Sequence, residues 1–327
     1  MPGWIVERGI GETRAALIDG DTILEAHIEP DDTLRAGTVL PARLARRLTQ
    51  RNEGIVVWDG GEAMLAPLPR GVPEGATVLV EITRPPLPEP GKPKRARARP
   101  ALEGTVPGEG PDLLDRLPDA QLVGRFDADL LEDAGWSTLL EEAITGQVGF
   151  ATGSLTLSLT PAMTLIDVDG EQAPAALAVA GAAAAARAIR RLDIGGSIGI
   201  DLPDAGDKAA RQAAAAAIDA ALPQPFERTA VNGFGFVQIV RRRSRVSIPE
   251  LFALEPVAAH ARALLRRAER TGGAGARTLT AHPALVAYLA ARPAWLAELE
   301  RRIGAPVGLR EDPALAISAG HVQAHFP

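Results

Sequence analysis

Two aspartates each follow a short apolar run with the character of a β-strand. The run TLI precedes Asp167, and the run IGI precedes Asp201. Between them, residues 173–192 are rich in alanine and predict a helix. A strand, a crossing helix and a second strand favour parallel neighbours in one sheet. Because ligands bind at the carboxyl ends of such strands, we expect both carboxylates to emerge at the same edge.

Two carboxylates at one sheet edge suit a hard divalent cation. Mg²⁺ is commonly held by one or two carboxylates while it keeps several waters and contacts phosphate oxygens. Such an ion lowers the pKa of bound water and stabilises charge on a phosphodiester under attack. The alternative is structural, because aspartate at the end of a strand is also a common turn or helix N-cap residue. The pattern alone leaves both interpretations open.

Composition indicates a globular protein of more than one folded unit. The 327 residues exceed the usual single domain, and 46% hydrophobic with 23% charged residues is ordinary for a globular chain. The absence of cysteine excludes disulfides, thiolate zinc sites and cysteine nucleophiles. The first residues lack the apolar core of a signal peptide, and Pro174 and Gly181 interrupt the alanine-rich run. We therefore expect no membrane segment and a cytoplasmic location.

Charge is distributed unevenly along the chain. The net charge of −6 does not by itself indicate a nucleic-acid-binding protein, but basic residues form two clusters. A solvated surface or a linker is the common explanation of such clusters, and phosphate binding is the alternative. Their members are Lys92, Lys94, Arg95, Arg97 and Arg99 in the first and Arg241, Arg242, Arg243 and Arg245 in the second.

Turn residues and hydrophobic periodicity predict a multidomain fold that combines α+β and α/β units. Short strands punctuated by Gly, Asn, Pro and Asp indicate a small barrel of the OB type near the N-terminus. The run RPPLPEPGKPKRARARP indicates a linker. The expected segments are N-terminal strands packing on the core (1–35), the barrel (36–84), the proline-rich basic linker (85–112), an α/β core (113–250) and a small α+β domain (251–327).

Several other motifs do not support a function. The sequence GGSIG has the G-x-S-x-G form of serine hydrolases but precedes a strand instead of following one. Two G-x-G pairs lack the third glycine of a dinucleotide loop. His321 and His325 lie on a predicted strand, which does not suit a two-histidine helix site. A nucleotide-dependent metabolic enzyme therefore has little motif support.

Three ordered segments resemble the ribonuclease E/G family. LLEDAGWSTLLEEAITG with the later TLIDVDGE is similar to a Glu-rich helix that leads to an I-D-[VI]-N strand. AARAIRRLDIGGSIGIDLPD is similar to an arginine-bearing helix followed by GG-x-I-x-I-D-F-x-D. VNGFGFVQIVRRRSR is similar to F-G-L-x-E-x-[ST]-R-x-R. The resemblance is strongest over residues 130–251 and covers most of the chain.

The resemblance implies a DNase I-like catalytic domain over residues 113–250 and Mg²⁺-dependent cleavage of single-stranded RNA. Asp167 and Asp201 match the metal ligands, and Asp169 occupies the place of an asparagine that orients the first ligand, so all three are candidate catalytic residues. A non-catalytic RNA-binding protein that keeps the scaffold is the alternative. The side chains expected to hold the RNA backbone are Arg241, Arg243, Lys92, Lys94, Arg95 and Arg97.

The chain also departs from the family pattern. Without cysteine, the Cys-x-x-Cys zinc link between protomers is absent, so a homodimer is compatible with the sequence but a zinc-linked assembly is not. The linker replaces most of the family's 5′-phosphate sensor. Barrel positions that are aromatic in the family are Val57 and Leu65 here. Asp169 replaces a neutral amide by a carboxylate, which cannot donate a hydrogen bond when ionised.

Overall fold

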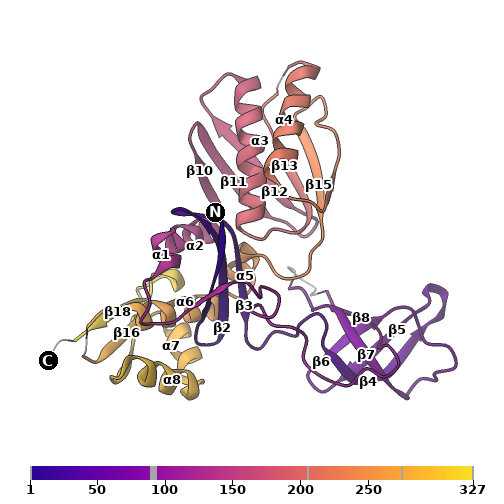
Figure 1. Cartoon of the computed structure of the whole chain (residues 1–327), viewed down its shortest axis with the longest axis vertical. Coiled ribbons are helices and arrows are strands. Elements are labelled where there is room, and N and C mark those ends of the chain that lie inside the picture. The colour runs from indigo at the N-terminus through magenta and orange to yellow at the C-terminus, as the bar shows by residue number, and fades with distance from the viewer. Residues whose placement is uncertain (1, 89–93, 205, 274, 326–327) are drawn as a thin grey trace.

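The computed structural model describes residues 2–88, 94–204, 206–273 and 275–325 (Figure 1). The N-terminal strands form an antiparallel meander, and a later strand pairs in parallel with the first of them. The sheet order is β3-β2-β1-β9. Its strands are β1 (Gly3–Arg8), β2 (Glu12–Asp19), β3 (Thr22–Pro30) and β9 (Gln121–Val123).

A closed five-stranded barrel follows, which confirms the small barrel predicted from the spacing of turn residues. Its strands pair in the order β4-β5-β6-β8-β7. Alternate side chains point inward and form a separate hydrophobic core. The elements are β4 (Val39–Leu48), a 3₁₀ turn η1 (Thr49–Arg51), β5 (Glu53–Trp58), β6 (Gly61–Leu65), β7 (Thr77–Arg84) and β8 (Ala96–Pro100).

The last of these strands corrects one prediction, because β8 lies within the expected proline-rich linker. Ala96 and Ala98 are buried in the barrel core, while Arg95, Arg97 and Arg99 point outward. The segment therefore alternates with the period of two that a half-buried strand requires. Alanine is small enough to close the barrel but contributes little hydrophobic signal, so the pattern resembles a basic linker.

A six-stranded mixed sheet forms the central unit, in the order β10-β11-β12-β13-β15-β14. Two neighbouring helices, α3 (Pro174–Arg191) and α4 (Lys208–Ala221), cover one face of it (Figure 1). The small residues of α3 allow close approach: a Cβ at Gly181 would lie 2.3 Å from Val168 Cγ1. The strands are β10 (Gln147–Phe150), β11 (Gly153–Leu159), β12 (Thr164–Gly170), β13 (Gly196–Asp201), β14 (Phe226–Arg228) and β15 (Phe236–Arg241).

The C-terminal part is a small α+β unit whose sheet has the order β17-β16-β18. Its helix α6 packs through buried ion pairs against the N-terminal sheet. Within the described residues, no helix is both long and apolar enough to cross a bilayer. The remaining elements are α1 (Leu130–Asp133), α2 (Trp136–Thr145), α5 (Ile248–Leu254), α6 (Pro256–Arg270), β16 (Arg277–Ala281), α7 (Pro283–Ala290), α8 (Pro293–Ile303), β17 (Val307–Glu311), η2 (Ile317–Ala319) and β18 (His321–Ala324).

Candidate functional site

The two strand-end aspartates lie side by side on the central sheet. β12 and β13 are parallel neighbours, and Asp167 is the Cα partner of Asp201. This confirms the parallel pair and the shared edge predicted from the sequence. Adjacent strands are about 4.8 Å apart, so the two side chains leave the sheet next to each other. Both are exposed to solvent.

The aspartates occupy the face of the sheet that α3 and α4 do not cover. Ile166 and Ile200, which precede them, are fully buried beneath the helices. Because successive side chains in a strand point to opposite faces, Asp167 and Asp201 point away from the helices. Asp169 follows two residues later on the same face and is also exposed. At the level of Asp169, strand β12 extends beyond the last residue of its neighbour β13.

One register row crosses five strands at this level. Cα pairing joins Gln147 to Thr156, Thr156 to Asp167, Asp167 to Asp201, and Asp201 to Phe236. The Gln147 amide Nε2 donates to the Thr156 hydroxyl oxygen at 3.2 Å. The uncovered face thus presents an amide, a hydroxyl, two carboxylates and an aromatic ring in one line.

The pair fits a hydrated cation better than a fully enclosed one. Within the parts of the chain that the structure describes, no group of three or more His, Asp or Glu side chains is placed to hold a metal ion. Two neighbouring, exposed carboxylates leave most coordination positions to water and to a phosphate group. This is the kind of site that Mg²⁺ occupies in phosphate chemistry.

The arginines at the end of β15 lie far from the aspartates. Arg241 is the Cα partner of Gly196, at the start of β13, whereas Asp201 is the last residue of that strand. Five residues of strand separate the two levels, which is about 17 Å. The structure therefore does not bring Arg241 and the following Arg243 to the carboxylate pair.

Both of these arginines are engaged within the chain. Arg241 Nη1 donates to the carbonyl oxygen of Ile194 at 3.2 Å and lies 3.7 Å from Asp193 Oδ1. Arg243 Nη2 donates to Glu250 Oε1 at 2.6 Å. Arg241 thus contacts the turn before β13 and Arg243 contacts α5, so the immediate role of both arginines is structural.

A buried cluster at the same end joins the central unit to the N-terminal sheet. His27 Nδ1 lies 3.0 Å from Asp193 Oδ2, and His27 Nε2 lies 3.2 Å from Glu25 Oε1. The indole of Trp4 stacks on the imidazole at 5.2 Å. Burial lowers the pKa of His27, but the carboxylates of Asp193 and Glu25 outweigh it and raise that pKa, with Arg245 opposing them. The cluster is a protonation-dependent junction outside the carboxylate site.

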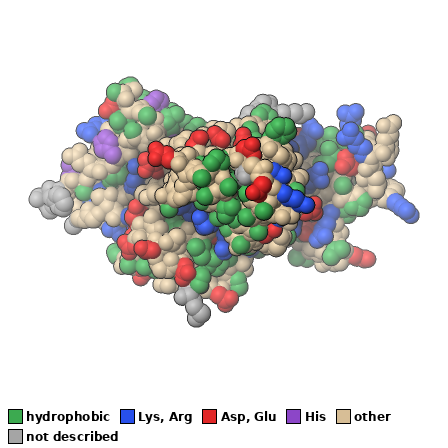
Figure 2. Space-filling model, turned by 90° about the horizontal axis from the view of Figure 1, so that it is seen from above, with side chains coloured by type: hydrophobic (Ala, Val, Ile, Leu, Met, Phe, Trp, Pro, Cys, Tyr) green, Lys and Arg blue, Asp and Glu red, His purple; other side chains and the backbone are tan. Residues whose placement is uncertain are grey.

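The barrel segment carries an excess of positive charge, although the whole chain is negative. Residues 39–100 contain eleven lysines and arginines against six aspartates and glutamates, a net charge of +5 in a chain of −6. In Figure 2, blue side chains lie on the barrel at the right. Arg95 Nε pairs with Glu62 Oε1 at 2.5 Å, and Lys94 pairs with Leu87 through its backbone. Arg97 is exposed, and Lys92 lies outside the described residues.

An apolar row flanked by arginines runs around the outside of the barrel. Register joins Arg46 on β4 to Ile55, Ile55 to Met64, and Met64 to Arg97 on β8. Among the described residues, neither Arg46 nor Arg97 forms an ion pair with an acidic side chain. This arginine-flanked row offers charge for a phosphate backbone and an apolar surface for the sugars and bases between.

The two barrel positions that are aromatic in the ribonuclease E/G family differ in orientation here. Val57 points outward on β5 and is half-buried. Leu65 is fully buried in the barrel core and offers no surface to a ligand. The strand alternation of β6 places Met64, not Leu65, on the outside.

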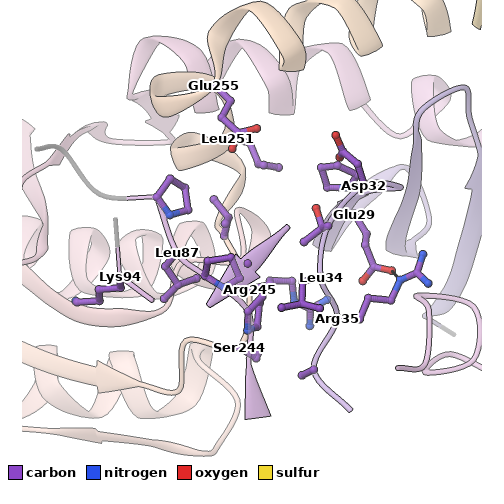
Figure 3. Close-up of a pocket in the computed structure, with 18 of the residues that line it drawn as sticks. Glu29, Asp32, Leu34, Arg35, Leu87, Lys94, Ser244, Arg245, Leu251 and Glu255 are labelled. Carbon is purple, nitrogen blue, oxygen red and sulfur yellow. Dashed lines mark hydrogen bonds and ion pairs between the residues drawn. The ribbon is translucent and has the colours of Figure 1, made fainter. Parts of the chain in front are cut away.

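A cavity of about 680 Å³ lies between the barrel, the end of β3 and the loop before α5. Figure 3 shows Glu29, Asp32 and Arg35 along one side of it and Lys94 along the other. Its cations are paired: Arg35 Nε lies 3.1 Å from Glu29 Oε1, and Arg245 Nε lies 3.0 Å from Asp193 Oδ2. We therefore place the candidate site on the uncovered sheet face and not in this cavity.

Several residues of the site were not predicted from the sequence. Thr156 carried a usable signal, since Ser154, Thr156 and Ser158 alternate with apolar residues as on a strand with one exposed face. Phe236 and Gln147 carried none, because their place in the register row depends on pairing between distant strands. A scan against protein-family models found no match, and a search of curated proteins found no significantly similar sequence.

Proposed function

We propose that this chain is a Mg²⁺-dependent endoribonuclease of the ribonuclease E/G type that cleaves single-stranded RNA, with a DNase I-like core. The observation that carries the proposal is the pairing of Asp167 with Asp201 on an uncovered sheet face. The order of the three resembling segments and the positive barrel support it. The cysteine-free composition suits a cytoplasmic location and any dimer that is not zinc-linked.

The residues of the site have distinct tasks in this proposal. Asp167 and Asp201 would hold Mg²⁺, which supplies an activated water and stabilises the negative charge of the phosphodiester. Asp169 adds negative charge beside the pair. Thr156 and Gln147 offer a hydroxyl and an amide that bind the sugar or phosphate of the adjoining nucleotide. The uncovered face lets a single strand approach the carboxylates.

The barrel would bind the RNA backbone without reading its sequence. Arg46 and Arg97 flank the apolar row of Ile55 and Met64, which suits alternate contact with phosphates and sugars. Because no aromatic ring stands in this row, the barrel contributes little base stacking, which elsewhere is worth about 1–3 kcal/mol per base. Its affinity therefore depends strongly on salt.

The test compares wild type with Asp201→Asn, and with Glu227→Gln as a control. Glu227 is exposed on β14 and belongs to the register level of Val240, away from the aspartate pair. Labelled single-stranded RNA is incubated with Mg²⁺, and Mn²⁺ binding is measured separately by electron paramagnetic resonance. We expect cleavage and metal binding in wild type and the control, and loss of both in Asp201→Asn. Cleavage that persists in Asp201→Asn refutes the site.

A non-catalytic RNA-binding protein is the second candidate. The observation in its favour is that the positive barrel accompanies a site of only two paired carboxylates, with no third acidic or histidine ligand among the described residues. In that case, wild type binds the labelled RNA with a strong dependence on salt, yet leaves it intact in Mg²⁺. The same incubation therefore separates the two candidates.

A further inference from the structure

An aromatic ring stands in solvent at the edge of the sheet that carries the aspartates. Phe234 is 88% exposed, although only seven phenylalanines occur in the chain. It lies in the short loop between β14 and β15. An apolar side chain of this size is usually buried, so an almost fully exposed ring beside a candidate site suggests a ligand that covers it.

The loop holds Phe234 in a defined position. The side-chain oxygen of Asn232 accepts the backbone N–H of Phe234 at 2.9 Å and that of Phe236 at 3.0 Å. The N–H of Gly235 donates to the Asn232 carbonyl at 3.2 Å. Gly235 has a φ of +85°, and a Cβ there would lie 2.1 Å from the carbonyl oxygen of Leu202. Only glycine fits this turn, which fixes the ring outside the protein surface.

The turn places Phe234 next to the carboxylate pair. The residue two positions later, Phe236, is the Cα partner of Asp201. The N–H of Leu202, which follows Asp201, donates to the carbonyl of Gly235 at 3.3 Å. The Cα atoms of Phe234 and Asp201 are therefore within about 12 Å of each other. A base attached to a phosphate at the aspartates lies within reach of the ring.

The neighbouring aromatic ring, that of Phe236, packs against the sheet. A Cβ at Gly199 would lie 2.6 Å from Phe236 Cζ and 2.9 Å from Leu165 Cδ2, so the ring of Phe236 rests on the sheet above this glycine. Phe236 is half-buried. Of the two rings at this edge, Phe234 alone has its surface free for a ligand.

We propose that Phe234 stacks on the base of the nucleotide that adjoins the phosphate held at Asp167 and Asp201. This assignment rests on the proposed action of that site on single-stranded RNA. Stacking of a base on an aromatic ring accepts every base, because each has a π-face. It therefore fixes the strand at the site without imposing a sequence. Loss of one such contact weakens binding by about 5-fold to 150-fold.

The experiment measures binding separately from cleavage. Labelled single-stranded RNAs, each lacking one base at a different position, are titrated with protein in Ca²⁺, and anisotropy reports the affinity. Phe234→Ala is compared with Phe126→Ala, since Phe126 is 92% exposed on another surface. Both substitutions remove exposed rings, so the fold is unaffected, which circular dichroism verifies.

In wild type and Phe126→Ala, one abasic position weakens binding by about 5-fold to 150-fold. Phe234→Ala shows the same loss with intact RNA, and the abasic position then causes no further loss. The assignment is overturned if Phe234→Ala binds intact RNA like wild type or if no RNA binds. It is also overturned if the abasic position weakens binding to Phe234→Ala as much as it weakens binding to wild type. Should this pattern appear while Mg²⁺ gives no cleavage, the stacking role stands and the endoribonuclease proposal fails.

Discussion

Replacement of Glu7 by glutamine tests the buried ionic contact between the two ends of the chain. Glu7 on β1 is 4% exposed. Its carboxylate accepts from Arg14 Nη1 at 2.8 Å, from Arg266 Nε at 2.9 Å and from Arg270 Nε at 3.2 Å. The last two belong to α6, so this one side chain connects the N-terminal sheet to the C-terminal unit. Glutamine keeps the shape but leaves the buried guanidinium groups without this negative charge.

The expected loss of stability follows from the lowered pKa of the Glu7 carboxyl. Burial raises the pKa of Glu7, but Arg14, Arg266 and Arg270 together outweigh it and lower that pKa from 4.5 to about 2. At about 1.4 kcal/mol per unit, the ionised form stabilises the fold by roughly 3 kcal/mol. Removal of one partner from a buried ion pair costs about 3–5 kcal/mol, in the same range. We expect Glu7→Gln to lower the free energy of unfolding by about 3 kcal/mol at pH 7.

The assay is urea unfolding followed by tryptophan fluorescence at pH 7 and pH 3, with Glu298→Gln as the control. Because the pKa of Glu7 is lower in the folded state, its contribution is complete above pH 4.5 and is lost as pH falls toward 2. The difference between wild type and Glu7→Gln therefore shrinks at pH 3. The pKa of Glu298 is likewise lowered to about 2, by Arg301 and Arg302, but at the surface.

Because solvent screens this surface pair, Glu298→Gln should lower the free energy of unfolding by less than about 1 kcal/mol. Equal losses for the two variants would refute the dependence on burial, and a loss for Glu7→Gln that does not change with pH would refute the electrostatic origin.

Two further predictions concern the junction and the barrel. The pKa of His27 is raised in the folded state, so the stability that its protonation contributes is complete below pH 6.5 and is lost as pH rises through the raised pKa. The thermal unfolding temperature, measured from pH 6 to 9, should therefore fall in wild type and not in His27→Gln. Replacing both Arg46 and Arg97 by serine should weaken binding of single-stranded RNA and reduce the slope of log affinity against log salt by about 1.4, whereas an unchanged slope in fluorescence titrations would contradict backbone contact by these arginines.

The parallel aspartate pair could be predicted because the required information is local. An apolar run, an alanine-rich helix and a second apolar run specify a crossover, and Asp167 and Asp201 each terminate a run. The barrel was predictable for a similar reason, since turn residues separate its strands at short intervals. Strand β8 was not, because Ala96 and Ala98 give too weak an apolar signal between arginines.

The surroundings of the site depend on pairing that local sequence does not specify. The run VQIVRRR predicts a strand but not its direction, and β15 runs antiparallel to β13. That direction brings Phe236 to Asp201 and takes Arg241 to the opposite end. The carboxylate of Glu7 similarly meets Arg266 across 259 positions of the chain. Such contacts follow from the packing of whole units, not from the residues beside them.

Asp169 offers the most direct test of whether the local charge serves the metal. It lies two residues beyond Asp167 on the same face, about 7 Å along the strand, at the position where the ribonuclease E/G pattern that the segment resembles has asparagine. A single negative charge at about 7 Å from a divalent cation in water contributes about 1 kcal/mol, and salt reduces this. Asp169→Asn should therefore weaken Mg²⁺ binding by about 3-fold to 5-fold.

Under this reasoning Asp169 attracts the cation but does not orient Asp167. The rate of RNA cleavage at saturating Mg²⁺ should then be the same in Asp169→Asn as in wild type, although the Mg²⁺ concentration for half-maximal rate rises. Glu227→Gln, with its carboxylate at the far end of the same face, should change neither quantity. A changed rate at saturating Mg²⁺ would mean that residue 169 positions the neighbouring ligand, as the family's asparagine does, and the charge would then be secondary to hydrogen bonding.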